Sequence, residues 1–334
     1  MLISVVVPVL NEERALPIFH GQLIAALTQL PHDYEIWYVA GGSRDNTSAI
    51  IRDMHRQDAR IKLLELSRNY GHQAALTAGL DYATGDVVIS LDGDGQHPPS
   101  LFSVMIAAYE HGADVVLMQR RSTAAISRSS RLLSGMFYQL INRLSNLEIT
   151  PDSADFRLLS RDVVDELIRM REQHRFLRGI ISWMGFEQVI IPFDAPERVG
   201  GQTKYTLRKR LHLASDAIFS FSTAPINLAI FAGVIVLLLA VVQIIYVLAV
   251  TIFEGREKLP PGWVSLMLAV LTIGGVQLLT IGIIGHYVGV AFQESKRRPL
   301  YFVNRRLSAL ENTSMSHDTK PKDLPLPIAA TPDN

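Results

Sequence analysis

Two carboxylates and an amide follow a short apolar run in the first third of the chain. The run 87–91, Val-Val-Ile-Ser-Leu, is typical of a buried strand, and Asp92, Asp94 and Gln96 come directly after it. Oxygen ligands of this kind suit hard divalent cations such as Mg²⁺ or Mn²⁺. We therefore predict a metal site here that would hold a diphosphate, with an Asp-Gly turn that merely ends the strand as the alternative. His97, followed by two prolines, fits a turn residue better than a ligand.

The segments around this motif alternate between apolar strands and amphipathic helices. Strands are predicted at 3–9, 34–39, 61–66, 87–91 and 113–118, and helices near 12–30, 44–58, 72–83 and 98–111. This alternation predicts an α/β fold with a Rossmann-like, mostly parallel sheet. Such sheets bind ligands beyond the carboxyl ends of their strands. The loops expected to converge there start at Pro8, Ala40, Ser67 and Asp92.

The C-terminal third is apolar enough to suggest a membrane. Ala217–Phe253 and Gly262–Gln293 contain no Asp, Glu, Lys or Arg. Each exceeds the roughly 20 residues that cross a bilayer, so we predict transmembrane helices at about 226–252 and about 263–291. Two buried helices of a soluble protein are the alternative. Basic residues lie outside the pair, at 208–210 and 296–298, which predicts that both termini are cytoplasmic.

Charge and cysteine content exclude other classes of protein. The 32 Lys and Arg residues balance 32 Asp and Glu residues, so no global positive field favours a nucleic-acid partner. Cysteine is absent, which excludes disulfides and thiolate metal sites. We divide the chain into a cytoplasmic α/β domain (1–205), an interfacial amphipathic segment (206–224), a two-helix transmembrane domain (225–293) and a basic, disordered cytoplasmic tail (294–334).

Several motifs together resemble glycosyltransferase family 2 with the GT-A fold. They are Val-Val-Val-Pro-Val-Leu-Asn-Glu-Glu at 5–13, Gly-Ser-Arg-Asp-Asn-Thr at 42–47, Ser-Arg-Asn-Tyr-Gly at 67–71 and Asp-Gly-Asp-Gly-Gln-His-Pro-Pro at 92–99. Further motifs at 155–159, 174–179, 183–185 and 201–205, followed by the two spans, narrow the resemblance to the bactoprenol glucosyltransferase branch, relatives of dolichol-phosphate mannose synthase. The resemblance covers about 1–306.

The resemblance implies a membrane-bound, inverting hexosyltransferase. It would move a hexose, expected to be glucose from UDP-glucose, from a nucleotide-diphosphate donor to undecaprenyl or another polyprenyl phosphate. The reaction would take place at the cytoplasmic face of the bacterial inner membrane, with Mg²⁺ or Mn²⁺ as cofactor. A homo-oligomer, such as a tetramer, is also implied.

Residue roles follow from the same resemblance. Asp155, Arg120 and Arg121 occupy positions implied to be catalytic. The donor-binding positions are Pro8, Asn11, Glu12, Gly41, Gly42, Ser43, Asp92, Arg198 and Lys204, and those for the acceptor phosphate are Arg120, Arg157 and Lys204.

An acceptor phosphate is already an anionic nucleophile, so the reaction needs little base catalysis. We therefore favour a role for Asp155 in positioning Arg157 or Arg120. A helix cap is the alternative for Asp155, a solvated basic pair for Arg120 and Arg121, and a basic loop facing lipid headgroups for 198–204.

The segment before Gly42 departs from the family pattern. Relatives carry two aspartates where this chain has Ala40 and Gly41. Losing a carboxylate that contacts the nucleotide would weaken its recognition by about 1–3 kcal/mol. A catalytically degenerate scaffold with altered nucleotide recognition is therefore an alternative function. A processive polysaccharide synthase would need more spans and a Gln-x-x-Arg-Trp motif, which this chain lacks.

Overall fold

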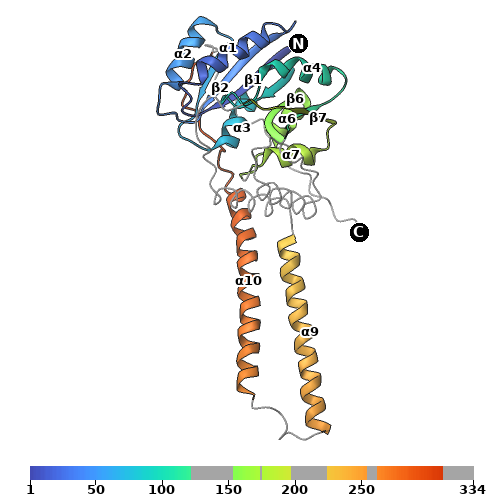
Figure 1. The fold of residues 1–334 in the computed structure, drawn as a ribbon. Helices are drawn as coiled ribbons and strands as arrows, with labels where there is room; N and C mark the ends of the chain where they lie inside the picture. Colours follow the sequence, from blue (N-terminus) through green and yellow to red (C-terminus); the bar gives the residue numbers. More distant parts are fainter. Residues whose placement is uncertain (122–152, 174, 197–223, 254–261, 311–334) are drawn as a thin grey trace, which may run out of the picture.

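A computed structural model describes residues 1–121, 153–173, 175–196, 224–253 and 262–310. Figure 1 shows an α/β domain joined to two long helices that extend from one of its sides. The strands are β1 (Leu2–Val9), β2 (Asp33–Ala40), β3 (Ile61–Glu65), β4 (Val87–Ser90), β5 (Val115–Arg120), β6 (Ser153–Ser160) and β7 (Gln188–Phe193). The helices are α1 (Leu16–Leu27), α2 (Thr47–Gln57), α3 (His72–Tyr82), the 3-10 turn η1 (Pro99–Leu101), α4 (Phe102–Glu110), α6 (Arg161–Arg169), α7 (Leu177–Met184), α9 (Ala224–Phe253) and α10 (Trp263–Ser295).

The strands form one sheet in the order β3-β2-β1-β4-β6-β5-β7. β1 pairs in parallel with β2 and β4, β2 with β3, and β5 with β7. The expected mostly parallel α/β sheet is therefore confirmed, and the five predicted strands all form. β6 is antiparallel to both β4 and β5, which places its first residues beside the carboxyl end of β4.

Helices cover both faces of the sheet. One apolar cluster joins α1, α2 and α4 to the sheet, and the other joins α3, α6 and α7. Nearly every residue of β1 and β2 is buried, as expected for strands sandwiched between helices. In Figure 1 the layer of α3, α6 and α7 is the one nearer to the long helices.

α3 lies unusually close to the sheet. A Cβ added at Gly79 would come within 2.1 Å of Val6 Cγ1 and 3.1 Å of Val39 Cγ2. Only a residue without a side chain permits this approach. The close packing sets the position of α3, and therefore of His72 at its first turn.

α9 and α10 run side by side away from the α/β domain (Figure 1). Within the described residues, the stretch Thr272–Ser295 of α10 is long and apolar enough to cross a membrane by length and composition. The apolar stretch found in α9 is shorter, Ala229–Leu239. Both predicted helices therefore exist, and one candidate span is found.

The chain after α10 returns to the α/β domain. Two antiparallel bridges join this segment to β3 and to the residue after it: Ala309 pairs with Leu63, and Val303 pairs with Leu66. This differs from the expectation that the chain from 294 onward forms a separate disordered tail, because the apolar side chains of Tyr301, Val303 and Leu310 pack onto the α3 side of the sheet. Residues 311–334 lie outside the described part.

Candidate active site

Polar loops converge beyond the carboxyl ends of β1 and β2, as predicted. Asn11 has a positive φ of 55°, and its Oδ1 accepts a hydrogen bond from the Arg44 backbone N–H at 2.8 Å. The Asn11 N–H donates to Ser43 Oγ at 3.2 Å, and the Glu12 N–H donates to Thr47 Oγ1 at 2.9 Å. The two loops that hold most of the predicted donor-binding residues are therefore bound to each other.

The loop after β4 is shaped by hydrogen bonds within it. The Gln96 N–H donates to Asp94 Oδ1 at 3.1 Å, and the Asp92 N–H donates to His97 Nδ1 at 2.9 Å. His97 is 3 % exposed and stacks on Phe156, with ring centroids 5.3 Å apart. Burial lowers the pKa of His97, so the ring is neutral and Nδ1 can accept. His97 thus organises the turn, in agreement with its interpretation as a turn residue.

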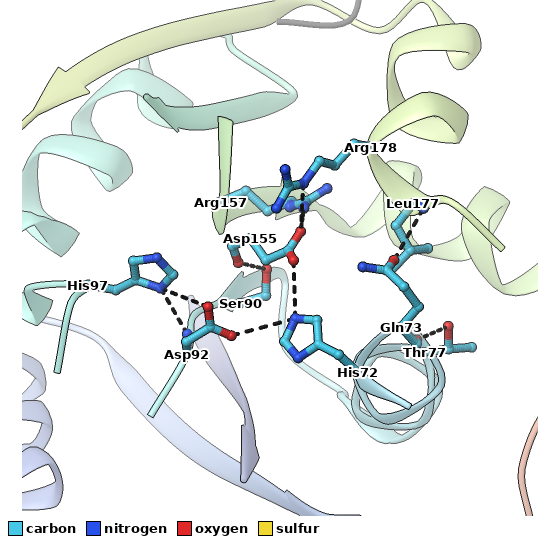
Figure 2. Close-up of polar contacts among 10 residues, drawn as sticks. All are labelled: His72, Gln73, Thr77, Ser90, Asp92, His97, Asp155, Arg157, Leu177 and Arg178. Atoms are coloured by element: carbon cyan, nitrogen blue, oxygen red, sulfur yellow. Dashed lines mark hydrogen bonds and ion pairs between the residues drawn. The ribbon is translucent and has the colours of Figure 1, made fainter. Parts of the chain in front are cut away.

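Asp155 is a buried carboxylate surrounded by cationic side chains. It lies within β6, where its backbone oxygen accepts from Ser90 Oγ at 3.0 Å, so the helix-cap alternative is wrong. Oδ1 pairs with Arg157 and accepts from Arg178 Nε at 3.1 Å, and Oδ2 contacts His72 Nε2 at 3.1 Å. Figure 2 shows these side chains converging on Asp155 from different elements.

This cluster keeps Asp155 ionised. Burial by itself raises the pKa of Asp155, but the charges of Arg178 and Arg157 and the hydrogen bond from His72 hold that pKa well below its ordinary range. A carboxylate with so low a pKa is a poor general base at neutral pH. The geometry fits a residue that positions arginine and histidine side chains.

His72 links the buried carboxylate to the loop after β4. Its Nε2 lies 3.1 Å from Asp155 Oδ2 and 3.5 Å from Asp92 Oδ1 (Figure 2). Burial opposes the charge on His72, but the hydrogen bond to Asp155 and the charge of Asp92 outweigh this effect and raise the pKa of His72. Its side chain is 37 % exposed, so it also faces the solvent side of the cluster.

The predicted arginines separate into three environments. Arg120 lies at the end of β5 and donates to Gln96 Oε1 at 3.2 Å, which joins it to the loop after β4. Arg121 is exposed and pairs with Asp194 at 3.3 Å. The side chain of Arg157 is 3 % exposed. Direct contact of Arg157 with an acceptor phosphate, as predicted, does not fit this burial.

Two residues of the cluster were missed by the sequence reasoning. Arg178, with 28 % of its side chain exposed, stands on α7 within a motif that carried the resemblance, but was given no role. His72 directly follows the motif at 67–71 and is the first residue of α3. A histidine directly after a turn glycine was the available signal. The predicted residues Arg198 and Lys204 lie outside the described residues.

The donor set after β4 fits a divalent cation in its chemistry. Asp92 and Asp94 are both partly exposed, and each supplies hard oxygen ligands. Gln96 Oε1 already accepts from Arg120. Among the described residues, no group of three or more His, Cys, Asp or Glu side chains has the arrangement of a metal site. Two carboxylates would therefore need ligands from a bound diphosphate to complete a coordination shell.

The two positions that lack the family's aspartates, 40 and 41, differ in the space around them. Ala40 is fully buried in the core. At Gly41 an added Cβ would meet only Asn69 Oδ1, at 4.0 Å, an ordinary van der Waals contact. A side chain at 41 can therefore be accommodated beside the loop after β3, whereas a carboxylate at 40 would enter the core.

Comparisons with known proteins agree over most of the chain. The model of the family described as glycosyl transferase family 2 matches residues 4–168. An uncharacterized glycosyltransferase of Synechocystis is 39 % identical over 90 % of this chain and 94 % of its own length. A protein of Escherichia coli named as a prophage bactoprenol glucosyl transferase homolog is 37 % identical over 91 % of this chain and 99 % of its own length.

Solved structures are more distant. The glucosyl-3-phosphoglycerate synthase of Mycobacterium tuberculosis, in complex with Mn²⁺, UDP-glucose and phosphoglyceric acid, is 18 % identical, with a TM-score of 0.42. The match covers 65 % of this chain and 77 % of that one. The assignment of a family therefore depends on the sequence relatives.

Proposed function

Because this chain belongs to glycosyltransferase family 2 and is a hexosyltransferase, we propose that it transfers glucose from UDP-glucose to undecaprenyl or another polyprenyl phosphate. The observation that carries the proposal is the contact of His72 with both Asp155 and Asp92. It joins a cationic cluster to the loop expected to hold the donor diphosphate. Relatives named bactoprenol glucosyl transferases, 36–37 % identical over nearly their whole lengths, support the choice of sugar and acceptor.

On the donor side, Asp92 and Asp94 would hold Mg²⁺ or Mn²⁺. The cation would act as a Lewis acid that stabilises the negative charge developing on the leaving diphosphate. Arg120, bound to Gln96, adds a positive charge next to the same loop. The hydrogen bonds within this loop hold the carboxylates in position before a ligand binds.

On the acceptor side, a phosphate oxygen of the lipid attacks the anomeric carbon. The new carbon–oxygen bond forms as the bond to the nucleoside diphosphate breaks, with inversion at the anomeric carbon. Deprotonation is not required, because the attacking phosphate is already an anion. Arg178 and His72 are the partly exposed cationic groups of the cluster and suit this anion, while Asp155 and the buried Arg157 fix their positions.

The two long helices support a reaction that takes place at a membrane. We propose that α10 and α9 both cross the bacterial inner membrane, with the α/β domain and both termini on the cytoplasmic side. The candidate span in α10 and the basic residues that follow it at 296–298 support this orientation. A polyprenyl phosphate would then present its headgroup on the side where the α/β domain lies. The predicted interfacial segment at 206–224 falls mostly in the undescribed part, and a homo-oligomer remains part of the proposal.

The degenerate-scaffold alternative rests on Ala40 and Gly41 alone. The Asp155 cluster and the loop after β4 are complete in the structure, which favours an active enzyme. Sugar transfer by the purified protein separates the two functions. A scaffold without catalysis would transfer no sugar, whether or not it binds UDP.

The test is transfer of labelled glucose into extractable lipid. Detergent-purified full-length protein is incubated with undecaprenyl phosphate and labelled UDP-glucose, other UDP-hexoses or GDP-hexoses, with Mg²⁺, Mn²⁺ or a chelator. We expect label in the lipid from UDP-glucose only when a metal is present. Asp94→Ala should abolish the transfer, whereas Asp53→Asn, which removes an exposed ion pair with Arg56 on α2, should not. Transfer by Asp94→Ala in the presence of metal would refute the assigned metal site, and no transfer from any donor would refute the proposed reaction.

A further inference from the structure

A pocket with three arginines in its lining lies where α10 meets the α/β domain. It has a volume of about 350 Å³, and Arg171, Arg297 and Arg298 line it together with Asp81 and Tyr301. Asp81 stands near the end of α3, nine residues after His72, which is about 14 Å along the helix axis. The pocket is therefore separate from the Asp155 cluster.

The single carboxylate that lines this pocket is already bound. Asp81 Oδ2 accepts from Arg171 Nη1 at 2.7 Å and from the Tyr301 hydroxyl at 2.6 Å. Within the described part of the chain, no carboxylate lies within ion-pair distance of Arg297 or Arg298, and both residues are exposed. Two guanidinium groups at the pocket thus have no carboxylate partner among the described residues.

The neighbouring acidic residues do not supply that counter-charge. Glu294, at the end of α10, accepts the backbone N–H of Gln173 at 2.7 Å. Glu172 is exposed, and desolvation by the protein around it together with the charge of Glu294 raises its pKa. The hydrogen bond of Glu294 fastens the end of α10 to the loop after α6 and leaves the side that carries Arg297 and Arg298 positive.

The turn after α10 has a defined backbone conformation. Arg297 has a φ of 46°, a left-handed backbone that residues with side chains rarely adopt. The next residue is held to the α/β domain, because Gln173 Nε2 donates to the Arg298 carbonyl oxygen. A turn that is strained and held in this way is suited to presenting the side chains of Arg297 and Arg298 in a fixed direction.

We propose that this pocket binds the phosphate of an anionic membrane lipid headgroup. The apolar stretch of α10 ends at Ser295, immediately before the turn, so its arginines lie at the level of the headgroups if α10 crosses the membrane. This step rests on the proposed membrane placement. Guanidinium groups bind phosphate oxygens in pairs of hydrogen bonds, which the two unpaired arginines can supply.

Thermal unfolding of the full-length protein in neutral detergent tests the pocket without any activity assay. The probes are dihexanoyl phosphatidylglycerol, dihexanoyl phosphatidylcholine and inorganic phosphate, at equal concentrations. Phosphatidylglycerol at about ten times its apparent Kd should raise the Tm by roughly 2–5 °C, and the other two probes should not. Arg297→Gln/Arg298→Gln should lose this shift. The matched control Arg305→Gln/Arg306→Gln removes the same charge from exposed residues beside β3 and should keep it.

Each other outcome is also decisive. An equal shift in both double variants, or none in the wild type, would overturn the pocket assignment. An equal shift with inorganic phosphate would overturn a lipid as the ligand. A wild-type protein that shows the lipid shift but transfers no glucose would refute the proposed reaction and leave the pocket standing.

Discussion

Two buried carboxylates lie at opposite ends of the same sheet, and their surroundings differ. Glu35, near the start of β2, accepts from the Ser4 hydroxyl at 2.5 Å and the Thr84 N–H at 2.8 Å, and pairs with Lys62 at 2.9 Å. Asp155, beside the end of β4, is instead contacted by Arg157, Arg178 and His72. Glu35 is satisfied mostly by neutral donors and one cation, whereas Asp155 has more positive charge around it than it can neutralise.

This difference distinguishes a structural carboxylate from one at a candidate active site. The charge of Glu35 is matched by the single charge of Lys62, and its hydrogen bonds stabilise the end of the sheet away from the site. The cluster of Asp155 retains positive charge on its partly exposed members, which an incoming anion can use. An excess of cations around a buried acid is thus the feature that marks the site.

Within this comparison of the two carboxylates, the largest effect is expected from neutralising Asp155. Asp155→Asn leaves Arg157 buried without this charged partner and removes the ion pair of Asp155 with Arg178, so we expect turnover to fall about 100-fold while donor binding changes less. Steady-state transfer of labelled glucose and UDP binding measure the two quantities. Asp194→Asn removes an exposed partner of Arg121 and is the matched control. Turnover of Asp155→Asn within five-fold of the wild type would show that the cluster is structural, like that of Glu35.

Removing the charge of Glu35 should affect stability and leave chemistry intact. Burial opposes ionisation of Glu35, but the hydrogen bonds from Ser4 and Thr84 and the contact with Lys62 lower its pKa from 4.5 to about 2. Glu35→Gln should therefore reduce the free energy of unfolding by about 3 kcal/mol at pH 7. A lowered pKa gives stabilisation that is complete above pH 4.5 and is lost as the pH falls towards 2.

The measurement for Glu35→Gln is thermal unfolding of variant and wild type between pH 7 and pH 3. The difference in stability should shrink below pH 4.5. A difference that stays constant down to pH 3 would show that the ionised form is not what stabilises this end of the sheet. Turnover per folded molecule at pH 7 should match that of the wild type.

A carboxylate introduced at position 40 or 41, at the end of β2 and the start of the loop after it, extends the comparison between structural and functional carboxylates. Gly41→Asp has room beside Asn69 and should tighten UDP binding by about 1–3 kcal/mol if this loop contacts the nucleotide. Ala40→Asp places the same group in the buried core, where a carboxylate is costly, and should lower the Tm. Calorimetric titration with UDP and thermal unfolding test both variants. Equal UDP affinity of Gly41→Asp and wild type would show that the loop does not recognise the nucleotide here.

The smallest effect is expected at Arg121. Its side chain is 61 % exposed and pairs with an even more exposed Asp194, and such pairs contribute little to stability. Arg121→Gln should keep turnover within about two-fold of the wild type. A large loss of transfer would restore the catalytic role that the sequence implied for Arg121 and would place it in the cluster when substrate is bound.

The parallel half of the sheet was predictable because its strands are short apolar runs separated by amphipathic helices. An apolar run such as 87–90 can be recognised as a strand without knowing which strands it pairs with. β6 was not predicted, because Asp155 and Arg157 introduce charges into a strand that is buried on both sides. Their mutual neutralisation, together with Arg178, becomes visible only when the elements are assembled.

The candidate site was predictable in its acidic residues and less so in its cations. Asp92 and Asp94 stand together in the sequence, so their proximity is local. His72 and Asp155 are 83 positions apart and meet only because α3 lies close to the sheet over Gly79. The segment at 303–309 was missed for the same reason, since β-bridges to a distant edge strand leave no local pattern.

The chain connects to its long helices from the two outermost strands. β7, the last described strand before α9, forms one edge of the sheet, and the segment after α10 covers β3 at the other edge. The covered edge of β3 is thereby closed to pairing with another chain. If α9 and α10 cross the membrane as proposed, connections at both edges of the sheet would restrict tilting and rotation of the domain above it. The active site would then keep a constant height over the lipid surface, and a hydrophobic substrate could meet it by moving in two dimensions.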